Sequence, residues 1–295
     1  MEKKTLIIID SNALLHRAFH ALPPLTNKKG QQTGAVYGFL LTLFKAIKDV
    51  QANCIVACFD LPKPTFRHEK FDQYKIHRAR TPDGIISQIP IAKEVLKALS
   101  IPIFEKEGYE ADDLIATLAK KSENDSEVYI VSGDLDNLQL VDEKIKVYTL
   151  GKGIKDSVIY DRAKVVERFG VTPEQMNDFK ALTGDTSDNV PGVPGIGKTT
   201  AADLIQRFGT IENLYSEIST DTAVLKPKIK EALKANKESA FLSKELVETK
   251  TDVEMDFNLD ACSIGRFNFI QAEKIFRDLD FISLIDRLPS VFGKG

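Results

Sequence analysis

LIIID, residues Leu6–Asp10, is a short β-branched run that ends in an aspartate. The same pattern returns in IVACFD (Ile55–Asp60) and in VYIVSGD (Val128–Asp134). Runs of this kind predict buried strands. Segments with helical periodicity accompany them, at residues 37–50, 86–99 and 111–121. Strands that alternate with helices at this spacing predict an α/β fold, with a parallel sheet covered by helices on both faces.

Asp10, Asp60 and Asp134 stand at the carboxyl ends of the three predicted strands. In a parallel sheet these ends lie along one edge, and ligands bind in the crevice outside that edge. We therefore expect the three aspartates to converge, and we expect the functional site of the protein to lie there.

The chain of 295 residues is long enough for about two domains. Its composition changes after Thr172: from Pro173 onward the sequence reads as short helices interrupted by Gly and Pro, with no convincing strand. We predict an α/β domain at residues 1–175 and a small all-helical domain at residues 176–295.

The composition excludes several classes of protein. Hydrophobic residues make up 43% of the chain, which excludes intrinsic disorder. No apolar segment is long enough for a signal peptide or a membrane span. Three cysteines cannot form a disulfide framework, and no histidine follows His77, which disfavours zinc chemistry in the rest of the chain. We expect a soluble, cytoplasmic protein with no membrane partner, and the net charge of −3 alone does not indicate nucleic acid.

Acidic clusters also occur at Glu110–Asp113 (EADD), Gly133–Asp136 (GDLD) and Gly184–Asp188 (GDTSD). Each alone has an ordinary structural explanation, because acids favour first helical turns, helix caps and tight turns. Together they are too many to leave uncompensated, since two ionised carboxylates ~5 Å apart repel by roughly 3 kcal/mol. An all-oxygen ligand set suits Mg²⁺ or Mn²⁺, and two such ions catalyse phosphoryl displacement. No cluster fits a calcium-binding loop, so catalysis is favoured over calcium storage.

Residues 61–80 form a basic segment directly after Asp60. It contains six Lys and Arg residues against two acids, with Phe66, Phe71 and Tyr74 interleaved. A solvated surface helix is one explanation. Because the segment leaves the predicted sheet at the acidic edge, we favour an element that binds the phosphates of nucleic acid and whose aromatic side chains stack on unpaired bases.

Gly192–Thr199 (GVPGIGKT) matches the P-loop pattern GxxxxGK[ST]. A P-loop joins a buried strand to a helix, but the residues before this stretch are polar and end in a proline. We instead predict a helix-hairpin-helix at residues 183–208. Its Gly195 and Gly197 would open a helix at 198–208, and its backbone N–H groups would bind a DNA phosphate without reading sequence. A purely structural glycine turn is the remaining alternative.

Taken in order, these motifs resemble the 5′ nuclease family, which includes the 5′-3′ exonuclease domain of bacterial DNA polymerase I and the flap endonucleases. The resemblance runs from about Leu6 to Leu288. It rests on RAFHALPPLTN, FRHEKFDQYKIHR, EADD, GDLD and GDTSDNVPGVPGIG, at residues 17–27, 66–78, 110–113, 133–136 and 184–197. It implies a PIN-like parallel-sheet core with a helical arch around residues 61–85, followed by a helix-three-turn-helix domain.

The resemblance also implies two divalent metal ions, Mg²⁺ with Mn²⁺ as a substitute, and a monovalent cation at the hairpin. The ligands of the first ion correspond to Asp10, Asp60, Glu110 and Asp112. Those of the second ion correspond to Asp134, Asp136, Asp185 and Asp188, with Asp113 in the adjoining shell.

DNA contacts are implied in two regions. Around the arch they correspond to His16, Arg17, Arg67, Tyr74, Lys75 and Arg78, and in the hairpin to Gly195, Gly197, Lys198 and Thr199. His16 stands where family members often carry Tyr or Phe, and Lys198 lies one position earlier than usual. Catalysis is expected from Lys75 and Arg78, which would neutralise the transition-state phosphate, and from the metal-binding Asp10, Asp112 and Asp134.

We therefore expect a structure-specific 5′ nuclease, a 5′-3′ exonuclease and 5′-flap endonuclease of DNA replication and repair. It would act as a monomer on 5′ ends, flaps and nicked or branched duplex in the bacterial nucleoid, with a polymerase domain in the same or another chain as its partner. The alternative is a module that holds branched DNA without cutting it. The acids argue against this alternative, because a binder has no reason to place repelling charges beside phosphates.

Overall fold

A six-stranded sheet forms the centre of the computed structural model, which describes residues 4–151 and 156–293. The strand order is β3-β2-β1-β4-β5-β6; all neighbouring strands pair in parallel except β5 and β6, which pair antiparallel. The strands are β1 Lys4–Asp10, β2 Cys54–Cys58, β3 Ile103–Phe104, β4 Ser126–Val131, β5 Ile145–Leu150 and β6 Ser157–Tyr160. The predicted parallel sheet is confirmed, and the sequence patterns had missed β3, β5 and β6.

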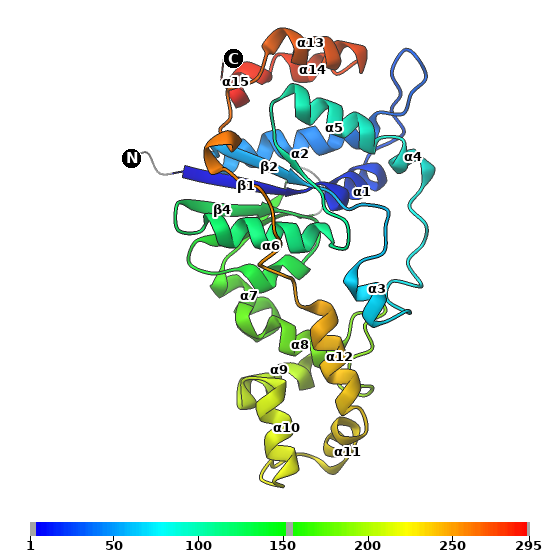
Figure 1. Cartoon of the computed structure of the whole chain (residues 1–295), viewed down its shortest axis with the longest axis vertical. Coiled ribbons are helices and arrows are strands. Elements are labelled where there is room, and N and C mark those ends of the chain that lie inside the picture. The colour runs from blue at the N-terminus through cyan, green and yellow to red at the C-terminus, as the bar shows by residue number, and fades with distance from the viewer. Residues whose placement is uncertain (1–3, 152–155, 294–295) are drawn as a thin grey trace.

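Helices cover both faces of this sheet (Figure 1). The helices of this part of the chain, including α3 and α4 of the basic segment, are α1 Ser11–Ala21, α2 Gly34–Val50, α3 Phe66–Lys70, α4 Asp83–Ile86, α5 Ile89–Ala98, α6 Ala111–Ser122 and α7 Arg162–Phe169. Side chains of β1 alternate between the faces: Ile7 and Ile9 share a core with α2 and α5, while Leu6 and Ile8 share another with α6. Burial on both faces explains why β1 is continuously apolar rather than alternating.

The second part of the molecule is helical and lies below the sheet in Figure 1. It consists of α8 Met176–Thr183, α9 Lys198–Phe208, α10 Ile211–Ser219, α11 Pro227–Ala235 and α12 Lys237–Val247. Helix α9 begins and ends where the sequence predicted, because Gly197 and Gly209 flank it. The buried side chains of α8, α9 and α10 continue the core of the α6 face.

The last helices contradict the predicted extent of the second domain. Helices α13 Phe269–Asp278, α14 Ile282–Ile285 and α15 Leu288–Phe292 pack on α2 and α5, at the end of the molecule opposite α11 (Figure 1). Their buried Phe276 and Phe292 complete the apolar core on that face of the sheet. The helical domain predicted at 176–295 therefore ends before α13, and the chain returns to the first domain.

The basic segment is less helical than the predicted arch. Only α3 and the short α4 are helices between residues 61 and 86, and turns connect them. Among the helices that the structure describes, none is long and apolar enough to cross a membrane.

Candidate metal and nucleic-acid site

Two of the predicted acids lie at the carboxyl edge of β1 and β2. Asp10 ends β1 and caps α1, since its Oδ1 accepts a hydrogen bond from the Ala13 amide at 3.1 Å; its Oδ2 accepts one from the Ser132 hydroxyl at 2.5 Å. Asp60 follows β2 and accepts the Ala111 amide of α6 at 2.8 Å. A local helix cap therefore holds the Asp10 carboxylate, and a long-range hydrogen bond to the start of α6 holds that of Asp60, both at the sheet edge where the sequence predicted them.

The EADD cluster opens α6 beside that edge. Glu110 is the N-cap residue of α6, and Asp112 lies in its first turn, where the helix dipole favours negative charge. Asn137 donates a hydrogen bond to the Asp112 carboxylate at 3.0 Å. Asp112 therefore faces the loop after β4, which carries Asp134 and Asp136.

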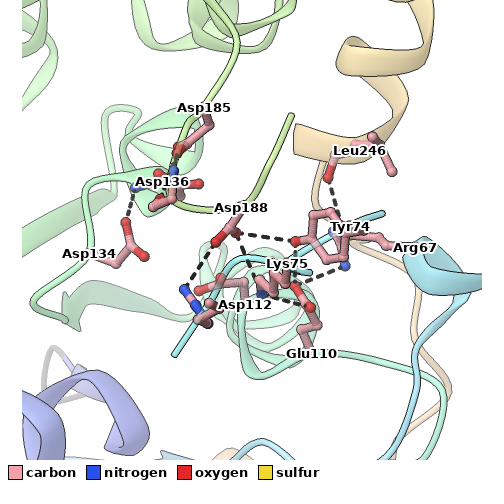
Figure 2. A network of polar contacts seen from close by, with 12 residues as sticks. Arg67, Tyr74, Lys75, Glu110, Asp112, Asp134, Asp136, Asp185, Asp188 and Leu246 are labelled. Carbon is pink, nitrogen blue, oxygen red and sulfur yellow. Dashed lines mark hydrogen bonds and ion pairs between the residues drawn. The ribbon is translucent and has the colours of Figure 1, made fainter. Parts of the chain in front are cut away.

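A lysine joins the next acids to the helical domain. Asp134 accepts the Asp136 amide at 3.0 Å. Lys180 of α8 donates both to Asp136 and, at 3.1 Å, to Asp185, so its ammonium bridges two predicted metal ligands. Asp185 and Asp188 thus reach the sheet edge from a separate domain (Figure 2).

Burial and mutual repulsion change the acidity of these carboxyl groups. Burial, with the charges of Asp60 and Asp134, raises the pKa of Asp10 to about 7. Burial and the charge of Asp134 raise the pKa of Asp136 to about 6, although Lys180 opposes this shift. The pKa of Asp112 is raised well above its usual range, first by burial and then by Asp10. Ionising all of them together is therefore unfavourable without added positive charge.

The donor chemistry fits hard divalent cations, because every acid offers oxygen only and their charges repel one another. The acids do not form a finished cage: in residues 4–151 and 156–293, no three His, Cys, Asp or Glu side chains are grouped tightly enough to hold a metal ion. Cationic side chains instead pair with these carboxylates. Lys75 pairs with Glu110, and Arg78 pairs with Asp188. Lys180 pairs with both Asp136 and Asp185. Ion binding would exchange these internal cations for metal.

The basic segment meets the acids through Tyr74 and Lys75 (Figure 2). Lys75 donates to Glu110 at 2.8 Å and lies 3.5 Å from Asp188. The buried Tyr74 hydroxyl shares its single proton between Glu110, at 3.1 Å, and Asp188, at 3.3 Å. Tyr74 is 4% exposed, so its predicted DNA contact is corrected. Arg78 is half-exposed and pairs with Asp188 at 3.1 Å. The cations predicted to contact the scissile phosphate therefore lie directly against the predicted metal ligands.

Arg67 lies in a different place from the predicted one, paired with Asp113. Arg67 is 2% exposed, and both of its terminal nitrogens donate to Asp113 at 2.8 Å. It also donates to the carbonyls of Leu246 and Glu248, which tie α3 to the end of α12. Arg67 cannot reach DNA from this position. Asp113 is fully buried, and its carboxylate accepts hydrogen bonds from the guanidinium and from the amides of Glu110 and Lys250. The predicted DNA contact of Arg67 is corrected: the pair is a structural link between the domains. Asp113 lies next to the predicted ligand Glu110, whose amide it accepts at 3.1 Å, so its predicted place in the adjoining shell stays a prediction.

His16 and Arg17 lie on α1 at the border of the site. Burial lowers the pKa of His16, and the charges of His20 and Arg78 add to this effect. Arg17 donates to the Gly151 carbonyl and lines an open cavity together with Gly133 and Asp134. Both positions allow a contact with DNA next to the acids.

The loop that carries Asp185 and Asp188 is closed by Gly184 and Gly192, which belong to the sequence motifs but had no predicted role of their own. A Cβ on Gly192 would lie 2.3 Å from the Gly184 nitrogen, so only glycine permits the two backbones to approach. Asp185 and Val190 exchange backbone hydrogen bonds at 2.9 and 2.8 Å within the loop. Because the turn is this tight, both aspartates lie on the side of the loop that faces the sheet edge.

The hairpin presents its backbone to solvent. Gly195 has a φ of +88° and, like Gly197, has open space where a Cβ would be. Lys198 and Thr199 are exposed in the first turn of α9, while Ile196 anchors the loop at 5% exposure. The residues before Gly192 are helix α8 and a turn rather than a strand, which excludes a P-loop here.

Lys180, Ser132 and Asn137 were missed by the sequence reading. Lys180 lies one helical turn before the GDTSD motif, and this spacing is the only signal that could have pointed to it. Ser132 and Asn137 flank the GDLD motif but carry no charge, so nothing in the sequence distinguished them from ordinary loop residues.

Family models match both parts of the chain. The 5′-3′ exonuclease N-terminal resolvase-like domain matches residues 5–170, and the 5′-3′ exonuclease C-terminal SAM fold matches residues 171–269.

Curated relatives and solved structures agree with these matches. The chain is 43% identical over 288 residues to DNA polymerase I of Bacillus subtilis (strain 168), covering 97% of this chain and 32% of that protein. It is 37% identical over 293 residues to the 5′-3′ exonuclease of Aquifex aeolicus (strain VF5), covering 99% and 98%. A structure of T5 5′-exonuclease with bound divalent zinc ions matches with a TM-score of 0.71 at 25% identity, covering 95% of this chain and all of that one. The chain therefore belongs to the 5′-3′ exonuclease family.

Proposed function

We propose that this protein is a metal-dependent nuclease that hydrolyses DNA phosphodiesters at 5′ ends and 5′ flaps. One observation carries the proposal: Glu110 and Asp188, predicted ligands from two domains, meet against Lys75 and Arg78 of the basic segment. Hydrolysis of a phosphodiester with divalent ions needs acids that bind the ions beside cations that bind the phosphate. In a protein that only binds DNA, the same acids would weaken binding, because they repel the phosphates.

Asp10, Asp60, Glu110 and Asp112 would hold one ion. Asp134, Asp136, Asp185 and Asp188 would hold the other. Divalent ions bound there would lower the pKa of water for attack and offset the charge on the leaving 3′ oxygen. Mg²⁺ is the expected ion, with Mn²⁺ as a substitute, because both favour oxygen ligands. A monovalent cation at the hairpin stays a prediction.

The remaining steps belong to side chains of this chain. Lys75 and Arg78 would bind the scissile phosphate and offset the charge that develops on it. Tyr74 would keep Lys75 oriented through its hydrogen bonds to Glu110 and Asp188. The exposed amides at the start of α9 would bind the duplex phosphates without reading sequence, so specificity would come from the shape of the DNA.

The names of the relatives support this proposal. The Aquifex aeolicus protein of nearly the same length is called a 5′-3′ exonuclease. This chain spans only 32% of the Bacillus subtilis DNA polymerase I, so the polymerase activity of that relative does not transfer. We propose a role in replication and repair beside a polymerase, in the same or another chain, with the protein acting as a monomer.

A 5′-flap substrate with a labelled 5′ end tests the proposal. The protein should release a short 5′ product in Mg²⁺ or Mn²⁺, and a chelator should stop the reaction. Asp112→Asn and Asp134→Asn should abolish cutting and keep duplex binding, because they remove charge without changing size. Binding without any cutting by the unaltered protein in either ion would support the alternative of a non-catalytic module for branched DNA.

A further inference from the structure

The far end of the helical domain carries a basic surface that the proposed site does not use. Residues 226–237 contain Lys226, Lys228, Lys230, Lys234 and Lys237 with a single acid, Glu231. We name these five lysines the α11 lysines, because they lie on α11 and its two flanks. Lys226, Lys228, Lys234 and Lys237 are exposed. The segment is strongly basic in a chain whose net charge is −3.

Local stability does not explain this charge. Helix α11 has no acid in its first turn, and Lys226 and Lys228 lie at its N-terminal end, where the helix dipole disfavours cations. Lys230 and Lys234 are a like-charged pair one turn apart, which also destabilises a helix. Among the described ion pairs, only Lys230 of the five has a carboxylate partner, the exposed Asp221. The arrangement costs stability, and a bound polyanion would offset that cost.

Helix α12 relates this surface to the proposed site. Its C-terminal end supplies the Leu246 carbonyl to Arg67, next to Tyr74 and Glu110. In its N-terminal half and middle, Ser243 accepts the Gly192 amide and Ser239 donates to the Gly192 carbonyl, both at 2.8 Å, which fixes the hairpin loop. Its N-terminal end follows directly on α11. The acids, the hairpin and the α11 lysines therefore follow one another along a single helix.

The length of α12 gives the spacing in base pairs. Its 11 residues span about 16 Å at 1.5 Å per residue, which corresponds to about five base pairs of duplex at 3.4 Å each. Helix α11 extends beyond that end of α12 (Figure 1). A duplex that leaves the site along the hairpin would reach the α11 lysines after roughly five to nine base pairs.

We propose that the α11 lysines are a second phosphate-binding surface, which holds the downstream duplex beyond the hairpin. This inference rests on the proposed function for the direction of the DNA. The surface adds affinity and no sequence preference, because lysine ammonium groups contact phosphates as point charges. Its contribution depends on duplex length, which separates it from the hairpin.

The test uses the triple variant Lys226→Gln, Lys228→Gln, Lys234→Gln. It leaves in place Lys237, whose ammonium lies over the Tyr215 ring, and Lys230, which pairs with Asp221. The control Lys29→Gln, Lys97→Gln, Lys274→Gln removes the same charge from exposed lysines of the α/β domain and α13. Binding to flap substrates is measured by fluorescence anisotropy, in the presence of a chelator and over a range of salt concentrations. The downstream duplex of the substrate has about 5 or about 12 base pairs and is closed at its far end by a DNA loop.

On the long duplex the triple variant should bind at least about fivefold more weakly, and its log–log salt slope should fall by about 2 to 3. On the short duplex, the affinity of the triple variant should equal that of the unaltered protein. The control variant should bind both duplexes as tightly as the unaltered protein. Equal weakening at both lengths, or an unchanged salt slope, would overturn the proposal. Flap cutting by the unaltered protein in Mg²⁺ is scored separately, so a failure of the nuclease proposal is distinguishable from a failure of this surface.

Discussion

Lys75 has a backbone conformation that few lysines adopt. Its φ is +56°, in the left-handed region that disfavours residues with a Cβ. Its amide donates to the Asp188 carbonyl at 2.9 Å, and its ammonium binds the Glu110 carboxylate. Strain of this kind persists where the surroundings fix it and often marks a functional residue. The contacts hold Lys75 at the acids before any substrate arrives.

Lys75→Ala should lower the single-turnover cleavage rate by about 100-fold or more and weaken substrate binding much less, because a group that offsets transition-state charge acts mainly on the chemical step. Lys70→Ala is the matched control in the same basic segment, since Lys70 is exposed and pairs with Glu245 away from the acids. Rapid-quench cleavage and anisotropy binding measure the two quantities. Equal losses in both for Lys75→Ala would make it a general phosphate contact.

Lys180 occupies the carboxylates that a metal ion would need. Lys180→Met should destabilise the metal-free protein, because Asp136 and Asp185 lose their shared cation. Mn²⁺ should then raise the melting temperature by about 3 °C more than in the unaltered protein, since the ion no longer competes with the ammonium. Lys120→Met, which breaks ion pairs with Glu123 and Asp142, should leave the Mn²⁺ effect unchanged. An identical Mn²⁺ effect in all three proteins would contradict this role.

Arg67 and Asp113 form a buried ion pair, with side chains 3% and 0% exposed. Arg67→Ala should cost about 3–5 kcal/mol of unfolding free energy, because it leaves a buried carboxylate without its cation. Adding Asp113→Ala should cost much less than the sum of the single changes. Urea unfolding of the four proteins gives the coupling energy. Additive losses would show that the pair is not coupled.

At the scale of the element, the hairpin separates a steric role of glycine from an electrostatic one. Gly197 has an ordinary negative φ and open space at its Cβ position, so Gly197→Ala should fold and bind duplex normally. Gly197→Asp adds a negative charge where a phosphate would lie. It should weaken duplex binding by about tenfold or more and keep the single-turnover metal dependence. Equal binding by the alanine and aspartate variants would remove the hairpin from the DNA interface.

At the scale of the whole molecule, the chain leaves the α/β domain, builds the helical domain and returns to cover α2 and α5 with α13–α15. Two crossings, rather than a single linker, therefore join the domains. The Arg67 link to α12 adds a side-chain connection beside the site. The fixed relation between the domains is what brings Asp185 and Asp188 to the sheet edge.

Phe276→Ala tests how strongly the returning segment is bound. Phe276 is fully buried against this face of the sheet, and its truncation should cost about 3–5 kcal/mol of unfolding free energy. Ile270→Ala on the same helix should change it by less than about 0.5 kcal/mol, because Ile270 is 79% exposed. Denaturant unfolding compares the two. A small loss for Phe276→Ala would show that α13–α15 add little to the core.

The sequence by itself determined the strands that carry Asp10, Asp60 and Asp134, their common edge, and the limits of α9. These are local properties: β-branched runs, helical periodicity and glycine punctuation act over a few neighbouring residues. The motifs also indicated the family. They could not show which member of a motif faces the site, because adjacent residues of one helix turn, such as Asp112 and Asp113, point in different directions.

Only the tertiary structure decided the remaining features. Arg67 became a buried link because Asp113, the Leu246 carbonyl and the Glu248 carbonyl surround it from distant parts of the chain. Lys180 became part of the site because α8 packs beside the loop after β4. Helices α13–α15 joined the first domain because its apolar face was still uncovered. Each outcome depends on side chains far apart in sequence, and burial and charge pairing act through space rather than along the chain.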